Sequence, residues 1–221
     1  HYDSQVDFKL LRYYQFNSGE IIDKYENISK PDDFDTYFNA TFAGTSGDLD
    51  NDGDIDIITG SQLSKGGKVI NVLINDGEGN FNTISLNVSN INNGYYFSEG
   101  DMLLHDLDDD GKKDLIFGGG FSNNSNESIF GFVRGNDSTF DHENLIVIEK
   151  FRDGLGLRNI MVKDLNDDGI DEIITFFSTG NGSGSYYDDE IPNIIKIYKK
   201  TNSSEGYLSD ISDQFFSESQ N

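Results

Sequence analysis

The chain has 221 residues, of which 40 are acidic and 16 basic, and its formal net charge of −24 excludes nucleic-acid phosphate and anionic membrane as partners held by charge. It contains no cysteine, which excludes disulfides and thiolate metal sites. No apolar run reaches the length of a membrane span, so we expect no membrane insertion. The 24 glycines and 2 prolines favour short strands joined by tight turns in a single all-β domain.

The first predicted element is a β-hairpin within residues 1–28. Two runs rich in aromatic and β-branched residues, 8–16 and 21–25, flank a turn at residues 17–19. No acidic loop precedes this hairpin, whereas one precedes each later pair of strands. We therefore predict that residues 1–35 hold only the last two strands of a four-stranded unit.

An acidic pattern begins at Asp48 and recurs at Asp106 and Asp164, so that its three copies are evenly spaced along the chain. A constant period of this kind is typical of repeat architectures, in which each repeat packs on its neighbours. Positions 1, 3, 5 and 9 carry side-chain oxygens, and the glycine at position 6 permits a tight turn. Such a loop suits Ca²⁺, which takes about six to eight oxygen ligands, and the carbonyl of position 7 could add one more.

The sequence thus predicts about three Ca²⁺ sites, and without a cation the carboxylates in each loop would repel one another. The alternative is a set of solvated acidic turns. The predicted ligands, with position 7 contributing its backbone carbonyl, are Asp48, Asp50, Asp52, Asp54 and Asp56; Asp106, Asp108, Asp110, Lys112 and Asp114; and Asp164, Asn166, Asp168, Ile170 and Glu172.

An EF-hand loop also begins with this pattern, but it requires a glutamate at position 12 and a helix on each side. Position 12 is Thr59, Phe117 or Thr175 here, which excludes the EF-hand. Short apolar, β-branched runs follow each loop instead, so each loop is predicted to be a turn between strands. The predicted strands are 38–42, 55–58, 68–74 and 81–87; 102–104, 115–117, 129–134 and 145–149; and 159–162, 173–177, 194–198 and 207–211, with 214–216 as a possible further strand.

The pattern D-x-D-x-D-G-x-x-D, followed by an apolar strand and repeated at an even spacing, resembles the FG-GAP or VCBS repeat of calcium-binding β-propellers, including the integrin α-subunit head. Residues 73–81 also resemble the strand-turn-strand that follows in VCBS repeats. The resemblance implies an all-β propeller of about four blades, built from four-stranded antiparallel repeats, three complete and one partial. Within one domain spanning 1–221, the expected units are a partial blade 1–35 and blades 36–94, 95–152 and 153–221.

The sequence leaves three alternatives for how the propeller ring is completed. The chain could be a monomer with one incomplete blade, a piece of a longer propeller, or one half of a dimer that completes a ring.

The expected function is that of a non-catalytic, calcium-braced binding or adhesion module that recognises an extracellular glycan or protein through its loops. Calcium is millimolar outside the cytosol, which favours a secreted, periplasmic or cell-surface location. Two tyrosine pairs lie among Asn, Asp and Gly, residue types that stack on sugars and bind their hydroxyls, although tyrosine also packs between blades. The alternative function is a calcium-dependent, lyase-like polysaccharide-degrading enzyme or a fragment of one. The candidate ligand-binding residues are Tyr95, Tyr96, Tyr186 and Tyr187.

Overall fold

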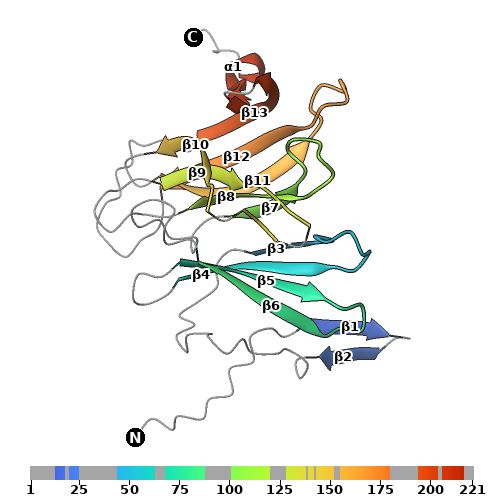
Figure 1. The fold of residues 1–221 in the computed structure, drawn as a ribbon. Coiled ribbons are helices and arrows are strands. Elements are labelled where there is room, and N and C mark those ends of the chain that lie inside the picture. The colour runs from blue at the N-terminus through green and yellow to red at the C-terminus, as the bar shows by residue number, and fades with distance from the viewer. Residues whose placement is uncertain are drawn as a thin grey trace, which may run out of the picture.

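The structure is a computed structural model, and within its described residues the chain is almost entirely β, with one single-turn helix, α1 (Figure 1). This confirms the predicted all-β class. The described residues are 13–17, 20–24, 44–62, 68–87, 101–119, 128–137, 139–141, 143–151, 155–179, 194–203 and 206–216.

Three four-stranded antiparallel sheets follow one another along the chain, and in each the strands pair in chain order. This confirms the three complete four-stranded units expected from the even spacing of the acidic loops. Sheet 1 contains β3 (Gly44–Gly47), β4 (Asp56–Gln62), β5 (Lys68–Asn75) and β6 (Phe81–Asn87). Sheet 2 contains β7 (Met102–His105), β8 (Asp114–Gly119), β9 (Ser128–Val133) and β10 (Ile146–Phe151). Sheet 3 contains β11 (Leu155–Lys163), β12 (Glu172–Thr179), β13 (Ile194–Ser203) and β14 (Gly206–Asp210).

The N-terminal hairpin also forms, with β1 (Tyr13–Asn17) antiparallel to β2 (Glu20–Lys24). Figure 1 shows this hairpin at the same end of the molecule as β6, whereas β13 and α1 lie at the opposite end. The successive four-stranded sheets are consistent with the propeller-like fold that was expected, and no closed ring is seen among the described residues.

Two segments differ from the predicted strands. The strand that pairs with β4 is β3, Gly44–Gly47, whereas the sequence placed it at 38–42, which lies outside the described residues. Residues 214–216 do not form a strand, because α1 spans Ser212–Phe215. Asp210 accepts a hydrogen bond from Ser212 N at 3.0 Å and so turns the chain, and Phe216 N then donates to Ser212 O at 3.0 Å.

Sheet 2 is the centre of the stack because both of its faces are buried. On β8, Leu115 and Phe117 pack in the core shared with sheet 1, while Ile116 packs in the core shared with sheet 3. Successive side chains of a strand point to opposite faces, which explains why this strand is a continuous apolar run. At Gly118 an added Cβ would lie 2.2 Å from Leu157 Cδ2, so only glycine allows this approach of sheets 2 and 3.

A polar network also joins sheets 2 and 3. Glu149 on β10 is hydrogen-bonded to the ammonium of Lys196 and accepts a hydrogen bond from Tyr198 Oη at 2.5 Å. Lys196 also forms an ion pair of 3.0 Å with Asp210. Burial, together with the Glu149 carboxylate, raises the pKa of Tyr198 above its ordinary value, so its hydroxyl stays protonated and donates.

Replacing Glu149 with alanine should lower the free energy of unfolding by about 2–4 kcal/mol, because it removes the acceptor of a buried hydroxyl and one partner of an interface ammonium. Urea denaturation measures this loss. Lys150→Ala, at an exposed position of the same strand, is the control and should change the free energy by less than about 0.5 kcal/mol. Equal midpoints for the two variants would contradict the role given to Glu149.

No helix among the described residues is both long and apolar enough to span a membrane.

Candidate metal centres

The three acidic loops share one backbone conformation at their turns. Position 4 has a positive φ in each, 61° at Asn51, 57° at Asp109 and 58° at Asp167. Asparagine and aspartate tolerate this left-handed region better than other side chains do. The glycine at position 6 also has a positive φ, between 82° and 95° in the three loops. The repeated sequence therefore folds into the same turn three times.

Hydrogen bonds within each loop hold the carboxylates of positions 1 and 5 against the turn. Position 1 accepts from the backbone N–H of the glycine, at 3.1 Å in the first loop, 2.9 Å in the second and 2.8 Å in the third. Position 5 accepts from the N–H of position 7 at 2.9 Å in all three. These bonds orient both carboxylates before any ion binds.

The carboxylate at position 9 has a structural role that the sequence did not predict. Asp56, Asp114 and Glu172 are 0%, 2% and 0% exposed. Each accepts a hydrogen bond from the N–H of position 2 at 2.8–2.9 Å. In the first two loops the other oxygen accepts at 2.9 Å from Asn75 N or Gly135 N, which ties the loop to the hairpin that follows.

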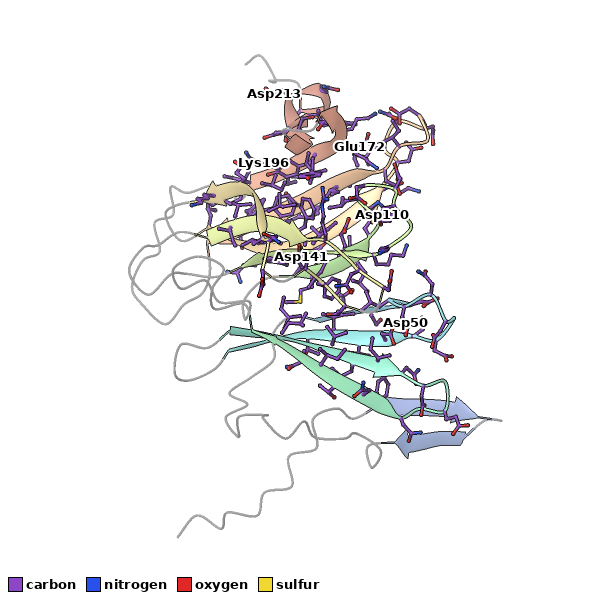
Figure 2. All side chains as sticks on the ribbon, viewed as in Figure 1. Asp50, Asp110, Asp141, Glu172, Lys196 and Asp213 are labelled. Atoms are coloured by element: carbon purple, nitrogen blue, oxygen red, sulfur yellow. The ribbon has the colours of Figure 1, made fainter. Side chains whose placement is uncertain are left out.

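The first two loops bring three carboxylates together in the way a cation site requires. Carboxylate oxygens of Asp48, Asp50 and Asp56 lie within 4.8 Å of one another, and those of Asp106, Asp108 and Asp114 do the same. Figure 2 shows Asp50 and Asp110 of these loops on the same side of the molecule.

Some of these oxygens are buried without a partner. Asp48 Oδ1, Asp50 Oδ1 and Asp108 Oδ1 have no hydrogen-bond donor. Burial, with Asp52 and Asp56 nearby, raises the pKa of Asp50 above its usual range. Buried polar atoms without a partner cost stability, and a hard divalent cation would satisfy them. The residues of the first two loops thus fit a calcium ion.

A known protein family matches the part of the chain that contains the first two loops. The family model of the FG-GAP-like repeat matches residues 48–117. Residues 48–117 thus resemble an FG-GAP-like repeat. The match begins at the first acidic loop, continues through the second, and ends in β8, which confirms the resemblance carried by these two loops. No curated protein matches the chain.

The third loop lies outside the matched repeat and differs in its chemistry. Position 3 is Asn166, an amide in place of a carboxylate. The ammonium of Lys199 is hydrogen-bonded to Asp168, and it lies 3.5 Å from Glu172 Oε1. The two carboxylate groups that fit a metal ion among the described residues do not include this loop.

The structure does not test the contacts predicted for the remaining site residues. Asp52 and Asp110 are exposed at position 5 of their loops, so their contact with an ion stays a prediction, as do the carbonyl ligands at position 7. The four tyrosines predicted to bind a ligand lie outside the described residues.

A cleft of about 510 Å³ lies between the second and third loops. His105 lines it, and burial lowers the pKa of this imidazole. The ammonium of Lys200 bonds Asp109 across the cleft and so links sheet 3 to the second loop.

The second loop should make the free energy of unfolding depend on pH when no ion is bound. Burial raises the pKa of Asp114 from 3.8 to about 6. The folded protein then holds this proton more tightly than the unfolded chain, so the stabilisation is complete below about pH 4 and is lost as the pH rises through about 6. In excess chelator, the free energy of unfolding should fall by roughly 2–3 kcal/mol over this range through Asp114.

Denaturant unfolding from pH 4 to 7 measures this fall, and Asp114→Asn is the control because its side chain does not titrate. Calcium should remove the fall in the wild-type protein, since the ion favours the carboxylate form. Parallel pH profiles for the two proteins in chelator would show that Asp114 titrates normally.

Proposed function

We propose that this protein is a calcium-stabilised, non-catalytic binding or adhesion module that works outside the cytosol, secreted, in a periplasm or on a cell surface. The observation that carries the proposal is the pair of carboxylate groups in the first two loops, whose buried oxygens lack hydrogen-bond donors. Sites built from turns of this kind suit the high calcium concentrations found outside cells.

The proposed role of the ions is to fix the ends of two sheets. Asp48, Asp50 and Asp56 would hold one ion, and Asp106, Asp108 and Asp114 the other. Because Asp56 and Asp114 also bind Asn75 N and Gly135 N, an ion at either site would brace both the loop and the adjoining hairpin. An ion would also offset the repulsion among carboxylates that lie this close.

The proposed partner is an extracellular glycan or protein that the loops contact. Loops carried on a rigid β scaffold are common binding surfaces, and the strong negative charge disfavours polyanionic ligands. Tyr95, Tyr96, Tyr186 and Tyr187 supply the aromatic surfaces that a sugar ring would stack on.

A glycan array in millimolar calcium tests the glycan version of this proposal. The protein should bind a defined set of neutral glycans, and the fourfold variant Tyr95→Ala, Tyr96→Ala, Tyr186→Ala and Tyr187→Ala should lose at least about tenfold in affinity, since each stacked ring contributes about a kilocalorie per mole or more. Phe216→Ala, which removes a different exposed aromatic side chain, is the control. Unchanged binding by the fourfold variant would reject glycan recognition through these tyrosines.

A further inference from the structure

A lysine occupies the position in the third loop where a cation would be expected. Lys199 lies on β13 and is paired in register with Glu172 on β12. Its ammonium is hydrogen-bonded to Asp168 at position 5 and lies 3.5 Å from Glu172 Oε1 at position 9. Glu172 is fully buried and the Lys199 side chain is 24% exposed, so this charge is held within the loop rather than in solvent.

The corresponding position is uncharged in sheet 1 and is an arginine in sheet 2, and neither residue hydrogen-bonds a carboxylate of its loop as Lys199 does. Extended by one residue, the strand register places Ile74 opposite Asp56 and Arg134 opposite Asp114. Ile74 carries no charge. Arg134 forms a long ion pair, 3.7 Å from its Nε to Asp108 Oδ2, and its guanidinium lies over the Tyr207 ring of sheet 3, 4.8 Å from the ring centre, where it donates a hydrogen bond to the Tyr207 hydroxyl.

The charges of the third loop also match a single ammonium better than a divalent ion. Asn166 removes one of the carboxylates found at position 3 of the other loops. The ammonium of Lys199 already neutralises one charge of this loop through its contacts with Asp168 and Glu172. Incoming Ca²⁺ would have to displace this ammonium or accept its repulsion.

We propose that Lys199 takes the place of the calcium ion in the third loop, so that the chain binds two calcium ions and keeps its third loop folded without metal. This inference rests on the proposed calcium function of the first two loops. It would reduce the number of ions expected from the sequence from about three to two, and it would make sheet 3 the calcium-independent sheet.

Counting the bound ions tests this inference, by calcium titration calorimetry and by metal analysis of the gel-filtered protein. The wild-type chain should bind two ions, and Asp168→Asn should still bind two. Asp110→Asn, the matched change at position 5 of the second loop, should bind one. Three ions in the wild type, or the loss of one in Asp168→Asn, would overturn the inference while leaving the calcium function intact. No bound ion in any of these proteins would overturn both.

Lys199→Met provides a second test, because methionine keeps much of the side-chain length but removes the charge. In chelator this variant should melt at a lower temperature than the wild type, since the third loop loses its internal cation. In calcium it should bind a third ion and recover part of that loss. Two bound ions together with an unchanged melting temperature in chelator would overturn the role of Lys199. If the variant does not fold, the Asp168→Asn count decides.

Discussion

Transfer of the calcium-loaded protein into excess chelator should lower its melting temperature by about 10–20 °C. At a free calcium concentration about a hundred times the dissociation constant, each site stabilises the fold by about 2.7 kcal/mol. Two sites then contribute about 5 kcal/mol, and in a chain of this size each kilocalorie per mole shifts the midpoint by about 2–4 °C. Thermal unfolding followed by circular dichroism measures the shift.

Magnesium is the control for this experiment. It prefers a small octahedral site and gives up its water reluctantly, so at the same concentration it should restore much less of the lost stability. A melting temperature that is the same in calcium and in chelator would show that the first two loops are solvated acidic turns and bind no ion.

Asp56→Ala should be the most damaging single substitution in the metal loops, lowering the free energy of unfolding by about 3–5 kcal/mol. The buried carboxylate of Asp56 accepts hydrogen bonds from Leu49 N and Asn75 N. Alanine leaves both donors without their acceptor and also removes a proposed ligand of the first ion. Denaturant unfolding should show a loss in chelator and a larger one in calcium.

Asp52→Ala is the matched control, because Asp52 is exposed and accepts a hydrogen bond from Asp54 N within its own loop. It should weaken calcium binding at the first loop but change stability in chelator by less than about 1 kcal/mol. If Asp56→Ala is as stable as Asp52→Ala in chelator, position 9 is a metal ligand without the bracing role.

Much of the fold could be predicted from the sequence, because the even period of the acidic loops indicates the repeats and the apolar runs indicate the strands. The strands after each acidic loop, such as β4 and β8, were predicted to within a few residues. The first strand of sheet 1 was misplaced because Gly44–Gly47 has the composition of a turn. The period itself could have located it, since Met102–His105 of sheet 2 ends directly before the second acidic loop, as Gly44–Gly47 ends directly before the first.

The relation of the sheets to one another could not be predicted in the same way. Ring closure depends on contacts between residues far apart in the chain, and the sequence left it open. Sheet 3 meets sheet 2 through pairs such as Glu149 with Tyr198 and Gly118 with Leu157, which become evident only when the register and the stacking are known.

At the candidate metal sites, the sequence placed positions 1, 3 and 9 in one loop, and in the first two loops their carboxylate oxygens lie within 4.8 Å of one another. It missed Lys199, which is distant from Glu172 along the chain and reaches the third loop only through the pairing of β12 with β13. Two features of the sequence could have indicated it: Asn166 at position 3 in place of an aspartate, and a lysine in the strand that pairs with the one containing Glu172.

Anomalous diffraction from crystals grown in calcium, or with calcium replaced by terbium, would locate the bound ions. We expect one peak within about 2.5 Å of the carboxylate oxygens of Asp48, Asp50 and Asp56, and a second at the same distance from those of Asp106, Asp108 and Asp114. No peak should appear in the third loop beside Lys199. The absence of a peak at both of the first two loops would contradict the calcium-stabilised module proposed for this protein.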